Sequence, residues 1–197
     1  NEIAHPPLFI WDPRSKAQGK RCESLVQTID LAPTLLDFFR ITPPESMQGV
    51  ALQNTIETDE PIRDAAIFGI HGGHVNITDG RYVYMRAPVS AANEPLFEYT
   101  LMPTHMRSMF TVQELQDIQL EEPFTFTKGC RTMKIASRPM IRPHQFGTLL
   151  FDLEADPNQE NTIINRDVEI RMIKLLVKVM QANDAPPEQY ERLGLPV

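Results

Sequence analysis

The residues best suited to chemistry are two histidines separated by two glycines, in the run His71-Gly72-Gly73-His74. Histidine can ligate a metal or contact a polar ligand, and glycine lets the backbone approach that ligand closely. A zinc site needs further ligands, and no third or fourth one stands at a suitable spacing. Three interpretations stay open: a plain turn, a turn that contacts a ligand, and a metal site.

No complete catalytic motif accompanies these histidines. The chain lacks GxSxG, GxxxxGK[ST], HExxH and CxPxR. Cys22 and Cys130 lie close to basic residues, which favour a reactive thiolate, but neither has an orienting histidine nearby in sequence. Asp152, Glu154 and Asp156 flank a turn, where turn formation explains them better than acid–base catalysis. We therefore assign no catalytic residue and no metal ligand in this chain.

Composition excludes further classes of protein. The net charge of −7 argues against nucleic-acid binding, which requires a basic surface. No stretch approaches the ~18 apolar residues of a membrane span, and no signal peptide is visible. The two cysteines could form one disulfide or remain separate thiols. Because the sequence begins at Asn1, we expect a processed chain or part of a longer one.

The N-terminal part predicts elements of a larger sheet. The apolar run 7–12 is typical of a buried strand, which needs neighbours on both sides. Residues 30–40 predict a helix, with Asp30 as N-cap and Pro33 in its first turn.

The remainder predicts a small antiparallel sheet and a long helix. Strands are expected over 65–70, 74–78 and 81–86, with Asp79-Gly80 as a hairpin turn, and over 148–153. Asn165 should cap a helix over 166–181, and a short helix should follow over 187–194. Between the expected strands 81–86 and 148–153 we expect a long irregular insertion, 87–146, with a strand at 96–100 and a short helix at 111–119.

The expected fold class is α+β. A small antiparallel sheet is packed by a long C-terminal helix, and a strand and helix that belong to a larger α/β sheet precede it. We divide the chain into 1–55, the tail end of that larger α/β domain, and 56–197, a C-terminal α+β subdomain.

Four segments together resemble the second half of the sulfatase family, within the alkaline phosphatase-like superfamily. They are AHPPLFIWDP (4–13), VQTIDLAPTLL (26–36), MQGVAL (47–52) and LFDLEADP (150–157). The last match is partial, because Gln159 stands where Glu is commoner and Asn161 is displaced. Residues 87–146 match only loosely.

This resemblance implies that the expected strand and helix in 1–55 belong to an alkaline phosphatase-like α/β sheet. It also implies that the catalytic residues lie upstream. Sulfatases use a formylglycine nucleophile and a Ca²⁺ ion, and no position here matches the residues that supply them. The chain alone should be inactive, with an upstream catalytic α/β domain as partner and an anionic sulfate ester as substrate. By analogy, His71, His74, Asn76 and Arg107 are candidate substrate-binding residues.

Two alternatives remain open. One is a phosphonate or phosphodiester hydrolase of the same superfamily, and the other is a non-catalytic module that binds an anionic sugar. The resemblance leaves the compartment open, and a periplasmic or secreted parent would suit a Cys22–Cys130 disulfide.

Overall fold

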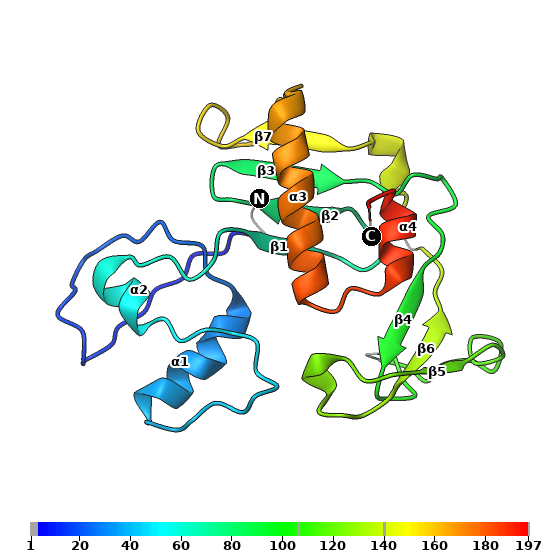
Figure 1. The fold of residues 1–197 in the computed structure, drawn as a ribbon, viewed down its shortest axis with the longest axis horizontal. Coiled ribbons are helices and arrows are strands. Elements are labelled where there is room, and N and C mark those ends of the chain that lie inside the picture. Colours follow the sequence, from blue (N-terminus) through cyan, green and yellow to red (C-terminus); the bar gives the residue numbers. More distant parts are fainter. Residues whose placement is uncertain (1–3, 106, 140, 197) are drawn as a thin grey trace.

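Two antiparallel sheets lie beside a short helical N-terminal region in the computed structural model of the chain (Figure 1). The structure describes residues 4–105, 107–139 and 141–196. The larger sheet has four strands in the order β1-β2-β3-β7, and the smaller has three in the order β4-β6-β5. The mixed α+β class is therefore confirmed, with one more sheet than the sequence indicated.

The four-stranded sheet consists of β1 (Ala66–Gly69), β2 (Val75–Thr78), β3 (Tyr82–Arg86) and β7 (Leu149–Asp152), all antiparallel. The expected hairpin between β2 and β3 is present. Asp79 Oδ1 accepts hydrogen bonds from the backbone N–H groups of Arg81 and Tyr82, at 3.1 and 2.7 Å. A short acceptor side chain at this position stabilises the turn directly.

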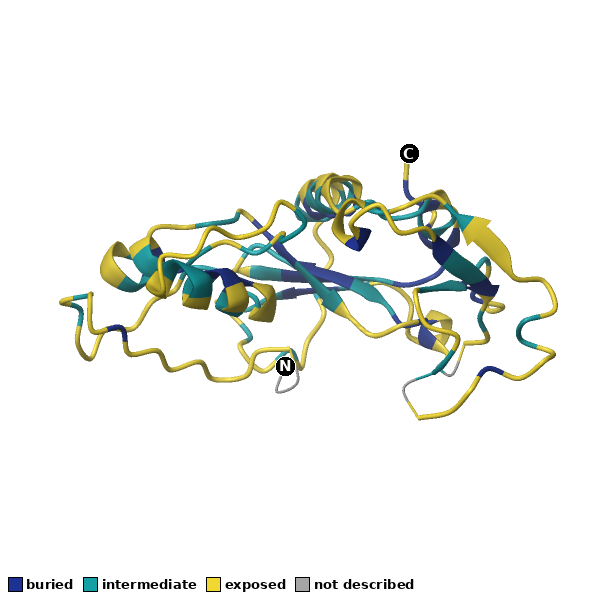
Figure 2. Ribbon diagram, turned by 90° about the horizontal axis from the view of Figure 1, so that it is seen from below, coloured by how far each residue is buried: buried dark blue, intermediate teal, exposed yellow. Residues whose placement is uncertain are grey.

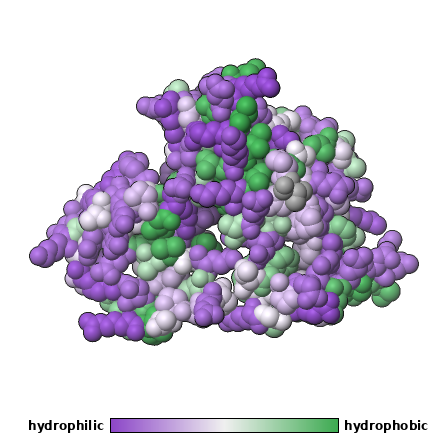
Figure 3. Space-filling view, in the orientation of Figure 1, coloured by the Kyte–Doolittle hydropathy of each residue, from purple (hydrophilic) through white to green (hydrophobic). Residues whose placement is uncertain are grey.

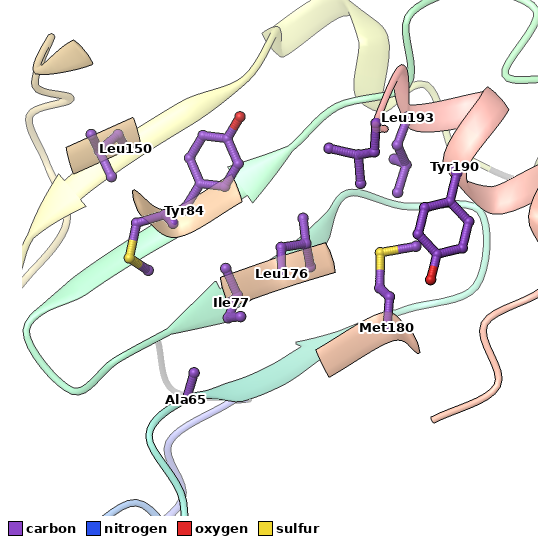
Figure 4. Close-up of a cluster of buried hydrophobic side chains, with 10 residues drawn as sticks. Ala65, Ile77, Tyr84, Leu150, Leu176, Met180, Tyr190 and Leu193 are labelled. Carbon is purple, nitrogen blue, oxygen red and sulfur yellow. The ribbon is translucent and has the colours of Figure 1, made fainter. Parts of the chain in front are cut away.

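The main core lies between this sheet and α3 (Arg166–Ala182) (Figure 4). Register places four side chains in one row across the sheet: Ile67, Ile77, Tyr84 and Leu150. Met172, Leu176 and Met180 of α3 are buried with most of this row. Complete burial of one such side chain contributes roughly 1.5–3 kcal/mol.

The two C-terminal helices begin and end where the sequence predicts. Asn165 Oδ1 accepts a hydrogen bond from Val168 N at 3.2 Å, which confirms the cap of α3. The next helix, α4 (Pro187–Leu193), ends at Gly194, whose φ of +59° suits glycine. No helix in the described ranges is long and apolar enough to cross a membrane.

A second sheet interrupts the insertion that the sequence left as irregular. It consists of β4 (Phe97–Thr100), β5 (Gln119–Glu121) and β6 (Thr132–Ala136). The strand expected at 96–100 is thus confirmed, but the expected helix at 111–119 is wrong, because residues 112–117 form successive turns. The strands β5 and β6 were not expected, because both are short and pair with distant partners, so no local alternation reveals them. Two 3₁₀ helices, Thr125–Thr127 and Pro143–Phe146, complete this part.

The N-terminal region corrects one prediction and confirms another. Residues 7–12 do not form a strand but run as coil, and much of the N-terminal chain is exposed (Figure 2). Residues 7–11 are exposed, with Phe9 at 91% and Trp11 at 81%. A strand needs hydrogen-bonding neighbours, and the described chain offers none to this segment.

The expected helix at 30–40 is present as α1 (Leu31–Phe38), preceded by a 3₁₀ helix, Thr28–Asp30. Pro33 lies in the first turn of α1, as expected, and is buried. A further helix, α2 (Gln53–Thr58), was not anticipated. The division into 1–55 and 56–197 stays a prediction.

Candidate functional site

Asp30 lies at the centre of a buried polar cluster in the N-terminal region. We call this cluster, which also includes Thr34, Gly49 and Arg63, the clasp. Its carboxylate is fully buried and accepts hydrogen bonds from both terminal nitrogens of Arg63, each at 2.6 Å. It also accepts the backbone N–H groups of Val50 at 3.0 Å and Gln27 at 2.7 Å. Burial alone would raise the pKa of Asp30, but these hydrogen bonds outweigh it and hold the pKa below its usual range.

This arrangement corrects the predicted role of Asp30. Its side chain makes no capping bond to α1, and instead closes a capping box with Gln27 around the 3₁₀ turn. The sequence could not show this, because the Arg63 partner lies 33 positions away.

Two more residues of the matched motifs complete the clasp. Thr34 Oγ1 donates to the carbonyl of Asp30 at 2.5 Å and accepts from Leu52 N at 3.0 Å. Gly49 lies so close to the 3₁₀ turn that a Cβ there would be 2.1 Å from the carbonyl oxygen of Ile29. The motif residues 30, 34 and 49 therefore join loop 47–52 to the start of α1, which is a structural task.

The His71–His74 run connects β1 to β2. His71 Nε2 lies 3.0 Å from Ser137 Oγ, and His74 Nε2 lies 2.8 Å from the carbonyl oxygen of Gly147. The two rings thus bind different partners. Within the described ranges, no group of three or more His, Cys, Asp or Glu side chains could hold a metal ion. Cys22 and Cys130 are free, exposed thiols, so the disulfide alternative is not adopted.

Both glycines of this loop are closely packed against neighbouring parts of the protein. A Cβ on Gly73 would lie 3.1 Å from the carbonyl oxygen of Ile70 and 3.2 Å from Ile141 Cδ1. Gly72 has a φ of +71° and would meet a Leu96 methyl group at 3.3 Å. Close packing inside the protein therefore accounts for both glycines.

A buried arginine from the far end of the chain holds the same loop. Arg192 of α4 is 2% exposed, and its Nη1 donates to the carbonyl oxygen of Gly73 at 3.3 Å and to Asn93 Oδ1 at 2.7 Å. Asn93, 1% exposed, donates from Nδ2 to the carbonyl oxygen of Gly72 at 2.7 Å. Burial lowers the pKa of Arg192 from its usual range, although an arginine stays charged at neutral pH.

The other two candidate residues lie elsewhere. Asn76 is buried in β2, on the sheet face opposite the core row, and its Oδ1 has no hydrogen-bond partner within the described residues. Arg107 is exposed, and no hydrogen bond or ion pair between described residues joins it to either histidine. The structure thus brings His71 and His74 into one loop but does not gather all four candidates around one point.

Sequence reasoning missed a chain of polar contacts that continues from His71. Ser137 Oγ donates to Glu98 Oε1 at 3.1 Å, and His105 lies 3.7 Å from Glu98 Oε2 and 3.0 Å from Glu114 Oε1. Hydrogen bonds from the Thr111 backbone and hydroxyl, and then from His105, lower the pKa of Glu114 to about 2. Among these contacts, only the hydrogen bonds between Thr111 and Glu114 join residues that are three positions apart in the sequence.

A second polar cluster joins the small sheet to α4. Tyr99 OH donates to Glu188, and Lys134 lies 3.2 Å from the same carboxylate and 3.1 Å from Glu121. Burial, followed by the Glu188 hydrogen bond, raises the pKa of Tyr99. Lys134 also lies 4.6 Å from the centre of the Phe97 ring. Tyr99 and Phe97 thus contribute to packing and to the contacts between the small sheet and α4.

An open groove of about 730 Å³ lies beside residues 14–20, and none of its lining residues belongs to the His71–His74 loop. Arg14 lines it together with Lys16 and Lys20. The Arg14 guanidinium is already paired with Asp12 at 2.7 Å and Asp37 at 2.9 Å. Its charge is therefore neutralised within the protein.

Comparison with known proteins agrees with the motif pattern. The family model "N-sulphoglucosamine sulphohydrolase, C-terminal" matches residues 1–122. A protein of Clostridium perfringens (strain 13 / Type A) named "Arylsulfatase" is 37% identical over 75 residues, which cover 36% of this chain and 15% of that protein. The chain thus aligns with only a small part of that relative.

The residues of the clasp, Asp30, Thr34, Gly49 and Arg63, all lie inside the segment that the family model matches, and so does the loop with His71 and His74. The match covers more than half of the chain. This chain belongs to the family of N-sulphoglucosamine sulphohydrolase C-terminal domains.

Proposed function

We propose that this chain is the C-terminal part of a sulfate-ester hydrolase and docks against an upstream catalytic α/β domain of the same polypeptide. The observation that carries the proposal is the exposure of large apolar side chains in the N-terminal region, which we call the exposed N-terminal apolar surface: Leu8, Phe9, Ile10, Trp11, Leu35, Phe39 and Ile41. In the space-filling view, hydrophobic side chains reach the surface in the α1 region (Figure 3). A large exposed apolar patch is typical of an interaction site.

The upstream domain would supply the chemistry. A formylglycine nucleophile and a Ca²⁺ ion do not fit this chain, because it has no CxPxR motif and its described residues offer no group of metal ligands. Its own contribution is then to hold the substrate beyond the reacting ester. His71, His74, Asn76 and Arg107 remain the candidates. The hydrogen bonds that hold both histidine rings in one loop support His71 and His74 in particular.

The first experiment compares the intact polypeptide with this chain alone. We expect the intact protein to hydrolyse an aryl sulfate and the chain alone to show no turnover. Preferential hydrolysis of an aryl phosphonate or phosphodiester would favour the other branch of the superfamily. Binding of a sulfated sugar by the chain alone, with no hydrolysis by the intact protein, would favour a binding module.

The second experiment tests the candidate residues. Replacing His71 and His74 by Ala in the intact enzyme should raise KM severalfold while kcat changes little, because the loop binds substrate without taking part in bond cleavage. His144→Ala is the matched control, since His144 is also exposed and bonds a backbone carbonyl, that of Pro88. Unchanged KM in the double variant would reject the assignment.

A further inference from the structure

The guanidinium of Arg192 is buried beneath the His71–His74 loop with only neutral acceptors. Its three acceptor oxygens belong to the Gly73 carbonyl, the Asn93 side chain and the Gln189 side chain. No carboxylate among the described residues forms an ion pair with it. A buried charge normally has a counter-ion, because its loss of hydration is costly.

This charge is also held in place. Arg192 contacts Gly73 directly and Gly72 through Asn93, so both glycine carbonyls turn inward toward these donors. The α4 helix is itself attached to the sheet, because Arg86 donates to the carbonyl oxygens of Leu193 at 2.7 Å and Gly194 at 3.1 Å. Arg86 adds a second positive charge and no negative one.

We propose that Arg192 is a positioning residue for the His71–His74 loop, and that its unneutralised charge makes this loop the binding place for an additional acidic group of the substrate. The inference rests on the proposed function and deepens it, because it names the substrate class: a sulfate ester that carries a second anionic group. Arg192 does not touch the substrate. It sets the position of the loop backbone and the electrostatic potential at its surface.

Asn93 offers a way to neutralise the charge without removing Arg192. Asn93→Asp places a carboxylate against the guanidinium, and the positive φ of 57° at this position is tolerated by Asp as it is by Asn. Asn93→Ser is the matched control, because both variants lose the donor to Gly72 but only Asp adds a negative charge.

The experiment measures kcat and KM of the intact enzyme for two aryl sulfates, one with an additional carboxylate and one without. Asn93→Asp should raise KM for the carboxylate-bearing substrate about tenfold more than Asn93→Ser does, with similar effects of both variants on the other substrate. Equal effects of Asp and Ser on both substrates would overturn the proposal.

A second pair of variants separates positioning from mere attachment of α4. Arg192→Met should raise KM for the carboxylate-bearing substrate, and Arg192→Lys should restore part of the affinity because it keeps the charge. Arg86→Lys also loosens α4 but keeps its charge and does not contact the loop, so it should leave KM unchanged once folding is verified by circular dichroism. A rise in KM for Arg86→Lys equal to that for Arg192→Met would show that Arg192 only stabilises the helix.

Failure of the proposed function is distinguishable from failure of this inference. If the intact protein hydrolyses no sulfate ester, the proposed function is wrong. Calorimetric titration with inorganic sulfate then tests the loop directly: weaker binding in Asn93→Asp than in Asn93→Ser supports the inference, and equal binding or no binding in all variants overturns it.

Discussion

The N-terminal region (4–63) and the sheet-and-helix unit (64–196) are stabilised in contrasting ways. In the first, the central buried group is a carboxylate, Asp30, and most large apolar side chains are exposed. In the second, Ile77, Tyr84, Met172 and Leu176 are all completely buried. Polar hydrogen bonds specify one region, whereas burial of apolar area stabilises the other.

The motif residues and the core residues thus have different tasks: the motif residues position a loop, and the core residues stabilise the fold. Asp30, Thr34 and Gly49 stand in the segments that resemble sulfatases, and their contacts hold one loop in one position. Each hydrogen bond of this kind makes only a modest net contribution to the free energy of folding. Removing one of its two partners is nevertheless costly, because the other buried group is left unsatisfied. The region therefore has a defined local structure while many of its large apolar side chains stay exposed.

Of the variants proposed here, Gly49→Ala should destabilise the protein most, and it tests the hydrogen-bonded N-terminal region. The added Cβ would lie 2.1 Å from a backbone oxygen, so the loop must leave the 3₁₀ turn, at a cost of more than about 4 kcal/mol. Limited proteolysis of loop 41–52 measures the release. Gly129→Ala, which meets nothing within 4 Å, is the control and should cost only about 1–3 kcal/mol of backbone strain. Equal protease resistance in both variants would contradict the clasp.

Leu176→Ala tests the other region. Removing a fully buried side chain from the core should lower the free energy of unfolding by about 2–5 kcal/mol, as measured by denaturant unfolding. Lys174→Ala, on an exposed position of the same helix, should change it by less than about 0.5 kcal/mol. If the two variants unfold at the same denaturant concentration, this core does not dominate stability.

Asp30→Asn tests the N-terminal region through the pH dependence of its stability. Because the pKa of folded Asp30 lies below its unfolded value, its stabilisation is present above about pH 4 and is lost as pH falls through the folded pKa. At neutral pH the variant should lose about 3 kcal/mol, since Arg63 is left without its charged partner. Unfolding curves at several pH values check this, and the variant should show a smaller loss between pH 4 and 2 than the wild type.

The smallest effect on stability is expected from the exposed N-terminal apolar surface. Phe9→Ser with Trp11→Ser should change the unfolding free energy of the chain by less than about 0.5 kcal/mol, because both side chains are already in water. Self-association of the chain, followed by light scattering, should nevertheless fall. Phe146→Ser, which alters another exposed aromatic residue, should leave association unchanged. A monomeric wild-type chain would contradict docking through this surface.

Elements with local signals could be predicted and were confirmed. The Asp79-Gly80 turn, the Asn165 cap and the Gly194 terminus depend on residues within a few positions of each other. The second sheet could not be predicted this way, because β4 pairs with β6 across more than thirty residues. The strand expected at 7–12 was wrong for a related reason: an apolar run predicts burial, but no described segment pairs with it or covers residues 7–11.

The candidate site divides along the same line. The histidine pair and its glycines were visible in the sequence, and so was the family, because motifs are written in consecutive residues. Only the tertiary structure brought Ser137, Asn93 and Arg192 to that loop, from positions 66, 21 and 119 residues away from the groups they contact. Short-range spacing determines turns, caps and motifs by itself, whereas the partners of a buried polar group are decided by the packing of elements that are distant in the chain.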